Sequence, residues 1–200
     1  MDYGFETSAR EKGFVSVCGI DEAGRGPLAG PVYAAAVILP QGLVIEGLND
    51  SKKLSEKKRE ALFDIIKEKA EAFSVGIATA REIDEINILQ ATYLAMKRAV
   101  EGLPVPADYA LVDGNRMPPL SSPGETVIKG DAKCPSIAAA SIIAKVSRDR
   151  YMYELDREMP EYQFAKHKGY GTALHYEMIK KYGISDYHRL SFLKNLSEHN

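Results

Sequence analysis

Hydrophobic and polar positions along the chain follow two periods, one typical of strands and the other typical of helices. Short apolar runs bounded by polar or glycine-rich segments predict five strands. We place these strands at 15–20, 32–39, 73–80, 109–112 and 126–129. Longer segments with apolar residues three and four apart predict helices. We place these helices at 55–71, 82–102, 135–159 and 172–182, with a loop over 160–171 and a short helix after 191.

The order of these elements predicts an α/β fold with a mixed sheet. The link GRGPLAG between the first two strands is too short for a parallel crossover, so these strands should be antiparallel neighbours. The 200 residues contain no repeat or low-complexity segment and suffice for one main domain. We predict an N-terminal arm over 1–14, this domain over 15–160 and a helical C-terminal region over 161–200.

Charge is unevenly distributed along the chain. The net charge of −2 excludes a polycationic protein as a whole. Residues 162–194, however, carry six Lys and Arg against two Asp and Glu, together with three of the four histidines and five of the eleven tyrosines. Residues 1–128 carry 14 basic against 19 acidic side chains. A basic, aromatic region beside an acidic one is typical of nucleic-acid binding, although a solvated helix face would have the same composition.

The sequence contains no candidate membrane span or signal peptide. Its longest apolar run, 32–40, is too short to cross a bilayer, and no basic region followed by an apolar stretch opens the chain. We expect a cytoplasmic protein with no membrane partner. Cys18 and Cys134 lie far apart in apolar contexts, so we expect two buried thiols rather than a disulfide or a zinc site.

Carboxylates follow three of the predicted strands. Asp21 and Glu22 follow the first, Asp113 the fourth and Asp131 the fifth. A single acidic residue at a turn is usually a turn former or helix cap, but four that converge crowd negative charge, which a hard divalent cation relieves. Carboxylates without His or Cys favour Mg²⁺ or Mn²⁺, and two such ions can assist phosphodiester hydrolysis. Asp149 is the alternative fourth carboxylate, but its helix position beside arginines favours a structural salt bridge.

The glycine-rich turn after the first strand does not match a dinucleotide-binding loop. Gly24, Gly26 and Gly30 have the spacing GxGxxxG, and Pro27 and Pro31 oppose a regular helix through the turn. Glycines without side chains would instead allow the backbone to approach a sugar edge, with Arg25 as a partner for phosphate.

Five motifs together resemble ribonuclease HII, the bacterial type 2 ribonuclease H. They are DEAGRGPLAGPV, LNDSKKLS, LVDGN, KGDAKCPSIAAASIIAKVSRDR and HKGYGT, and the resemblance extends from about residue 15 to about residue 192. It implies an RNase H-like fold, with a mixed five-stranded sheet flanked by helices and a C-terminal helical extension. The domain over 15–160 would then be the RNase H-like catalytic domain.

The resemblance also implies an activity and its residues. The enzyme would cleave the RNA strand of RNA–DNA hybrids and incise 5′ of single ribonucleotides in duplex DNA, leaving 3′-hydroxyl and 5′-phosphate ends. The catalytic, metal-binding carboxylates would be Asp21, Glu22, Asp113 and Asp131, holding Mn²⁺ or Mg²⁺. The residues contacting the ribonucleotide would be Gly24, Arg25 and Gly26. Tyr170 would stack on the deoxyribose that follows it.

Other polar residues of these motifs have less specific roles. Lys52 and Lys53 are candidates to bind substrate phosphates, or they are solvated charges. His167, His175 and His188 are predicted to lie on the surface or contact phosphate, since a metal-activated water removes the need for a histidine base.

Three other functions remain open at this stage. The first is another nuclease or resolvase of the same fold, and the second is a non-catalytic nucleic-acid-binding module. The third is a small-molecule phosphotransfer enzyme, in which the basic, aromatic C-terminal region would have no obvious use. The GRG turn and Tyr170 favour a ribonucleotide-specific enzyme, because only such an enzyme needs to read a 2′-hydroxyl. Four carboxylates argue against a non-catalytic module, because they repel phosphate unless metal is bound. We expect a monomer whose substrates are RNA–DNA hybrids and ribonucleotide-containing duplex DNA.

Overall fold

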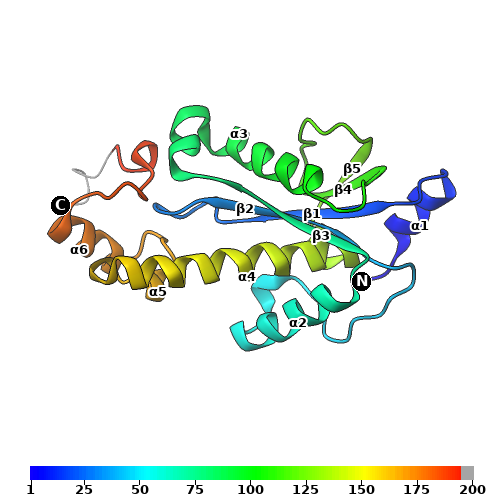
Figure 1. The fold of residues 1–200 in the computed structure, drawn as a ribbon, viewed down its shortest axis with the longest axis horizontal. Helices are drawn as coiled ribbons and strands as arrows, with labels where there is room; N and C mark the ends of the chain where they lie inside the picture. Colours follow the sequence, from blue (N-terminus) through cyan, green and yellow to red (C-terminus); the bar gives the residue numbers. More distant parts are fainter. Residues whose placement is uncertain (195–200) are drawn as a thin grey trace.

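The computed structural model of the protein describes residues 1–194. A central sheet is covered by helices on both faces, which gives three layers (Figure 1). The five strands lie in the order β3-β2-β1-β4-β5. Their bounds are β1 (Val17–Ala23), β2 (Val32–Ile38), β3 (Ala72–Ala78), β4 (Tyr109–Asp113) and β5 (Gly124–Val127). β2 is antiparallel to β1 and β3, whereas β1, β4 and β5 are mutually parallel, so the predicted mixed sheet is confirmed.

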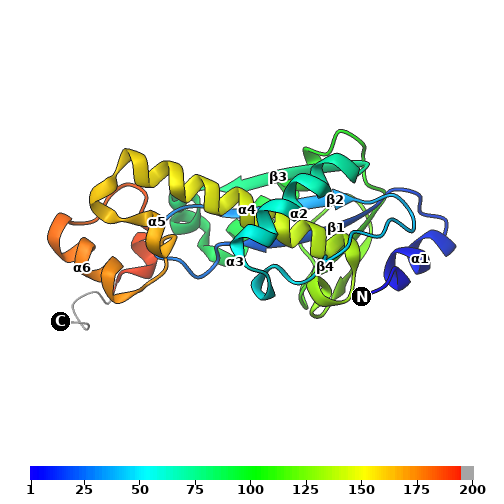
Figure 2. The same ribbon diagram turned by 90° about the horizontal axis from the view of Figure 1, so that it is seen from below.

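Helices connect and cover these strands. Their bounds are α1 (Gly4–Glu11), α2 (Glu56–Lys69), α3 (Ala80–Glu101), α4 (Pro135–Glu158), α5 (Phe164–His167) and α6 (Ala173–Tyr182). Single 3₁₀ turns are η1 (Ser51–Lys53), η2 (Gly130–Ala132), η3 (Pro160–Tyr162) and η4 (Leu190–Phe192). α3 covers one face of the sheet and α4 with α2 the other, while α5 and α6 pack at the C-terminal end of α4 (Figures 1 and 2). No helix within residues 1–194 is both long and apolar enough to span a membrane.

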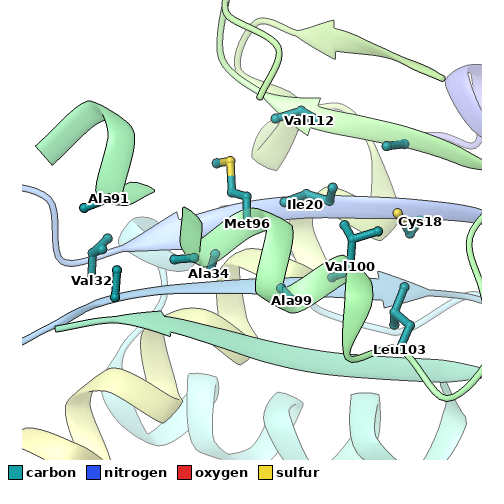
Figure 3. Packing of buried hydrophobic residues seen from close by; sticks show 14 of the residues in the cluster. Cys18, Ile20, Val32, Ala34, Ala91, Met96, Ala99, Val100, Leu103 and Val112 are labelled. Carbon is teal, nitrogen blue, oxygen red and sulfur yellow. The ribbon is translucent and has the colours of Figure 1, made fainter. Parts of the chain in front are cut away.

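Small residues allow the two helical layers to approach the central strands closely. A Cβ atom on Gly19 of β1 would lie 2.2 Å from the backbone carbon of Ser136 in α4, so only glycine fits there. On the opposite face, Ile20 of β1 packs with Met96 and Val100 of α3 (Figure 3). The apolar first half of α4 is buried as predicted, and both cysteines are buried and free.

The N-terminal arm contains a helix that its polar sequence did not predict. Glu6 of α1 is buried, and its Oε1 accepts hydrogen bonds from Ser136 N (3.1 Å), Ser136 Oγ (2.8 Å) and Cys134 Sγ (3.1 Å). This carboxylate therefore caps the first turn of α4, where a negative charge is favourable. The contact is tertiary, which is why the pattern within 1–14 gave no sign of it.

Other details of the elements also differ from the prediction. β5 ends at Val127 because Lys129 adopts a left-handed backbone conformation (φ 57°) that stops the strand. α3 is interrupted at Asn87 (φ 69°, ψ 163°), whose Oδ1 accepts from Leu89 N and Gln90 N and restarts the helix. The predicted loop over 160–171 contains η3 and α5. The helix predicted after 191 corresponds only to η4, and residues 195–200 lie outside the described chain.

Candidate active site

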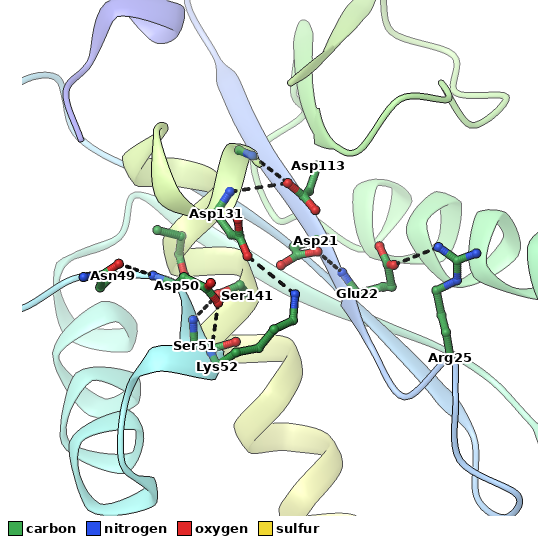
Figure 4. Close-up of polar contacts among 12 residues, drawn as sticks. Asp21, Glu22, Arg25, Asn49, Asp50, Ser51, Lys52, Asp113, Asp131 and Ser141 are labelled. Carbon is green, nitrogen blue, oxygen red and sulfur yellow. Dashed lines mark hydrogen bonds and ion pairs between the residues drawn. The ribbon is translucent and has the colours of Figure 1, made fainter. Parts of the chain in front are cut away.

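The topology brings the four predicted carboxylates to one edge of the sheet. Asp21 and Glu22 lie near the end of β1, Asp113 ends β4, and Asp131 lies in η2 just after β5 (Figure 4). Parallel strands end at the same edge, so their carboxyl termini meet. Because side chains alternate along a strand, Asp21 points to the α4 face with Gly19, and Glu22 points to the α3 face. The carboxylates therefore approach this edge from both faces of the sheet.

Most of the predicted site residues line one cavity of about 230 Å³. Its predicted members are Asp21, Glu22, Gly24, Arg25, Gly26, Lys52, Asp113 and Tyr170, and the additional ones are Ala23, Ser51 and Lys145. Asp131 lies beside the cavity, with Oδ2 3.6 Å from the Nζ of Lys52. Lys53 is exposed on η1 and does not line the cavity.

A second cavity of about 390 Å³ adjoins the carboxylates on the α3 side. It is lined by Glu22, Arg25, Leu89, Thr92, Tyr93, Met96, Asp113, Gly114, Asn115 and Arg116. Glu22, Arg25 and Asp113 belong to both cavities, so the carboxylates stand between two hollows in the surface.

Each carboxylate has a partner within the protein. Asp21 Oδ1 accepts from Glu22 N at 2.7 Å, and Asp113 Oδ1 accepts from Gly130 N at 2.7 Å. The Oε1 of Glu22 lies 3.4 Å from an Nη1 of Arg25, and Asp131 faces Lys52. These contacts spread the four carboxylates over separate partners.

Crowding and burial disfavour the charged forms of these groups. Burial, with repulsion from Glu22 and Asp113, raises the pKa of Asp21 well above its usual range. Burial also raises the pKa of Glu22 despite the opposing effect of Arg25, and that of Asp131, where the charge of Asp113 adds to it. The site therefore holds more negative charge than its neighbouring cations compensate.

A hard divalent cation fits this donor set. The donors are carboxylates without sulfur or imidazole, and their uncompensated charge is what such an ion relieves. Over residues 1–194, no three His, Cys, Asp or Glu side chains are gathered closely enough to hold an ion as they stand. The oxygens would reach a shared ion only after side-chain rotation away from partners such as Arg25.

Two buried arginines that the sequence pattern did not indicate hold the glycine-rich link after β1, and one of them, Arg189, bonds to the GRG turn itself. Arg189 donates from Nη2 to the carbonyl oxygen of Gly24 (2.6 Å), from Nη1 to that of Arg25 (2.9 Å) and from Nε to that of Gly30 (2.9 Å). Arg148 donates to the carbonyl oxygens of Ala29, Pro31 and Lys168. Burial lowers the pKa of Arg189 to about 9, so its guanidinium stays charged at neutral pH.

Tyr170 lies beside this turn with an exposed ring. Its exposed fraction is 43%, so the ring is accessible from solvent. A Cβ atom on Gly26 would lie 3.8 Å from the Cε1 of Tyr170, and the guanidinium carbon of Arg148 lies 5.9 Å from the ring centroid. The ring and the GRG backbone thus face the same cavity.

The prediction for the three C-terminal histidines is wrong. His167, His175 and His188 have exposed fractions of 6%, 0% and 2%, so they are neither surface residues nor phosphate contacts. The rings of His167 and His175 stack with centroids 4.2 Å apart, and Nε2 of His175 lies 3.1 Å from Nε2 of His188. Imidazoles can be buried in this way because each ring nitrogen finds a partner while the ring is neutral.

The structural role predicted for Asp149 is confirmed, with different partners. It is buried, and its carboxylate lies 2.7 Å from the Nζ of Lys145 and 3.9 Å from an Nη2 of Arg59. These partners come from one turn away on α4 and from α2, rather than from the adjacent arginines. Asp149 thus links the two helices on that face of the sheet.

Comparison with known proteins identifies the family. The family model described as Ribonuclease HII matches residues 18–195. The ribonuclease HII of Clostridioides difficile is 56% identical over 192 residues, covering 96% of this chain and 75% of that protein. The crystal structure of ribonuclease H2 from Pyrococcus horikoshii has a TM-score of 0.75 and 27% identity, covering 92% of this chain and 98% of the other.

A ribonuclease HIII, Bst-RNase HIII, solved in complex with Mn²⁺, shares the fold at a TM-score of 0.71 and 20% identity, covering 90% of this chain and 67% of the other. The fold, the motifs along nearly the whole chain and the sequence matches agree with one another. The chain belongs to the ribonuclease HII family.

Proposed function

We propose that this chain, a ribonuclease H by family, incises duplex DNA on the 5′ side of a single embedded ribonucleotide as well as cutting RNA–DNA hybrids. The products would carry 3′-hydroxyl and 5′-phosphate ends. One observation carries the proposal: the GRG turn, Tyr170 and the carboxylates Asp21 and Asp113 line the same cavity. A reader of the sugar therefore lies within reach of the groups that support hydrolysis.

We propose that Mg²⁺ or Mn²⁺ is held by Asp21, Glu22, Asp113 and Asp131. When bound, such ions supply an activated water and stabilise the leaving 3′-oxygen of a phosphodiester. Lys52 and Arg25 already lie beside these carboxylates, and their positive charges would face the substrate phosphates. Lys53, exposed on the same turn as Lys52, is proposed as a further phosphate contact.

The backbone of the GRG turn is suited to recognise a ribose. Arg189 occupies the carbonyl oxygens of Gly24 and Arg25, which fixes the orientation of their peptide groups. The N–H groups of Arg25 and Gly26 have no backbone or side-chain acceptor among residues 1–194. They are therefore available as donors to a 2′-hydroxyl, the group that distinguishes RNA from DNA at a single position. Tyr170 would stack on the sugar that follows.

The test uses three duplexes of one sequence: all DNA, DNA with one ribonucleotide, and an RNA–DNA hybrid. Each is incubated with Mg²⁺, with Mn²⁺ or with a chelator, and the termini of the products are identified. We expect incision at the ribonucleotide and within the hybrid, both abolished by the chelator. Equal cutting of the all-DNA duplex would instead indicate a nuclease or resolvase of the same fold without ribonucleotide recognition.

We also propose that the chain acts as a monomer in the cytoplasm. The carboxylates Asp21 and Asp113, the GRG turn and Tyr170 already line one cavity within a single chain, which supports the proposal. Sedimentation at concentrations at which the enzyme is active would test this, and a dimer as the active species would contradict it.

A further inference from the structure

A chain of hydrogen bonds connects three buried or partly buried groups to the backbone of Tyr170. The N–H of Ser185 donates to Nδ1 of His188 at 3.0 Å. Nε2 of His188 lies 3.1 Å from Nε2 of His175, and Nδ1 of His175 lies 2.9 Å from the carbonyl oxygen of Tyr170. The proposed reaction uses neither imidazole, yet the chain of hydrogen bonds ends at the residue that carries the exposed ring.

The partners determine where each proton lies. Because a backbone N–H donates to Nδ1 of His188, the only proton of the neutral ring is on Nε2, where it faces His175. Nε2 of His175 must then accept, which places its proton on Nδ1, directed at the carbonyl of Tyr170. The chain therefore runs in one direction, from the backbone of Ser185 to the backbone of Tyr170, with both rings neutral.

The hydrogen bonds of the Tyr170 segment run to several parts of the chain, beginning with the N–H of Tyr170, which donates to the carbonyl oxygen of His167 at 2.9 Å. Tyr170 lies between Gly169 and Gly171, and glycines leave the backbone on both sides of the ring with few restrictions. Before the ring, the carbonyl of Gly169 accepts from Leu28 N at 2.7 Å. At the ring, the carbonyl of Tyr170 accepts from Thr172 N within the same segment and from His175 on α6. His175 thus connects this peptide group to a separate helix.

We propose that His175 is a positioning residue for substrate discrimination, which holds the Tyr170 ring beside the GRG turn through the carbonyl of Tyr170. This inference rests on the proposed stacking role of Tyr170. A displaced ring would lose its contact with the sugar after a single ribonucleotide. Cutting of a continuous hybrid, in which several positions can be cut, would depend less on that contact.

Two substitutions of His175 test its contact with Tyr170 separately from its contact with His188. The amide nitrogen of His175→Asn replaces Nδ1 and keeps the donor to Tyr170. The longer side chain of His175→Gln replaces Nε2, which keeps the contact with His188 and loses the donor to Tyr170. The readout is the ratio of kcat/KM on a single-ribonucleotide duplex to kcat/KM on a continuous RNA–DNA hybrid. We expect His175→Gln to lower this ratio about tenfold, and His175→Asn to keep it within about threefold of the wild type.

The measured ratios decide whether His175 positions the Tyr170 ring. If the two variants change the ratio equally, or if His175→Gln leaves it unchanged, the positioning role is overturned. The ratio of His175→Gln combined with Tyr170→Ala should equal that of Tyr170→Ala alone, and a further decrease would contradict action through Tyr170. If Tyr170→Ala by itself leaves the ratio unchanged, the stacking role in the proposed function fails, which is a different result from failure of His175→Gln alone.

Thermal melts establish that each variant is folded. If His175→Gln does not fold, His188→Asn replaces it, because the shorter side chain no longer supplies the donor to His175. We expect His188→Asn to lower the same ratio by a smaller factor. An unchanged ratio in folded His188→Asn would overturn the positioning chain.

Discussion

A Cβ atom on Gly24 would lie 2.1 Å from the Nε of Arg148, so the GRG turn and the buried guanidinium occupy positions that exclude any side chain between them. Gly24 also has a φ of +93°, a backbone conformation that residues other than glycine rarely adopt. Backbone strain and steric contact therefore coincide at one residue of the proposed ribose-reading turn, and Gly13 offers a means of separating them.

Gly24→Ala should lose activity by far more than strain alone explains. Gly13 has a φ of +96° with no atom within 4 Å of its Cβ position, so Gly13→Ala has the same strain without the steric contact. We expect Gly13→Ala to cost about 1–2 kcal/mol in the free energy of unfolding with normal cleavage. Gly24→Ala should reduce kcat/KM on the single-ribonucleotide duplex at least about tenfold, because Arg148 must move. Equal activity of the two variants would contradict this account of the turn.

Arg189→Lys should impair cutting even though it keeps the charge. A lysine cannot donate simultaneously to the carbonyl oxygens of Gly24, Arg25 and Gly30, and buried carbonyls without donors cost about 1–3 kcal/mol each. We expect a lower melting temperature and at least about a tenfold loss of kcat/KM on the single-ribonucleotide duplex. The control is Arg157→Lys, on the exposed side of α4. A normal rate in Arg189→Lys would show that the turn holds its conformation without the guanidinium.

Asp21→Asn should abolish cleavage and leave stability unchanged or slightly higher. Burial and the neighbouring carboxylates already oppose the charge of Asp21, so its removal relieves repulsion in the metal-free protein. Activity in Mg²⁺ and thermal melts without metal provide the two measurements. Asp64→Asn, an exposed position on α2, is the control. Substantial cleavage by Asp21→Asn would refute its assignment as a metal ligand.

The contribution of His175 and His188 to stability should decrease as the pH falls from about 6.5 to about 4. Burial is the largest cause that lowers the pKa of His175 and of His188 from 6.5 to about 4. Between these two pKa values the unfolded chain binds protons that the folded chain excludes, so acid favours unfolding. The contribution of the two histidines to stability is fully present above pH 6.5, the pKa of the unfolded chain. Each shift corresponds to roughly 3 kcal/mol at most. The raised pKa values of Asp21, Glu22 and Asp131 act in the opposite direction as the pH falls, so the test compares two proteins. In chemical denaturation at several pH values, acid should destabilise a folded His188→Gln variant less than it destabilises the wild type. Identical pH profiles of the two proteins would contradict the neutral histidine pair.

Tyr170→Ala should cut the single-ribonucleotide duplex at least about tenfold less efficiently, because stacking of a ring on a nucleotide contributes roughly 1–3 kcal/mol. Tyr170→Phe keeps the ring and should lose much less. Since the ring is 43% exposed, melting temperatures should change little in either variant. Wild-type kcat/KM for Tyr170→Ala would eliminate the stacking role.

The carboxylate-bearing edge of the sheet could be predicted from the sequence because the signal there is local. Asp21, Asp113 and Asp131 lie at or just beyond the ends of apolar strands, and strand direction alone brings them together. The resemblance of the motifs to a known family added the substrate. The residues that support this edge could not be found in the same way. Arg189 lies among polar residues near the end of the chain, and only tertiary structure shows that its guanidinium is buried.

The three C-terminal histidines show most clearly what the sequence could not predict. A sequence rich in Lys, His and Tyr has the composition of a solvated surface, and nothing in it shows that His175 and His188 satisfy each other's hydrogen bonds. The helix over Gly4–Glu11 was missed for a related reason, because Glu6 finds its partners 130 residues further along the chain. Both errors concern polar groups that are buried because they are paired.

The hydrogen bonds from Arg189 to the GRG turn also have a consequence for synthesis of the chain. A ribosome translates Asp21, Glu22, Asp113 and Asp131 long before it reaches Arg189, which follows Gly24 by 165 residues. At about 5–20 residues per second, the 58 residues from Asp131 to Arg189 take roughly three to twelve seconds to translate. A nascent chain, or a product of premature termination, would thus contain every acidic group of the nuclease before its recognition turn has been fixed. The proposed selectivity for ribonucleotides would then be among the last properties that the growing polypeptide acquires.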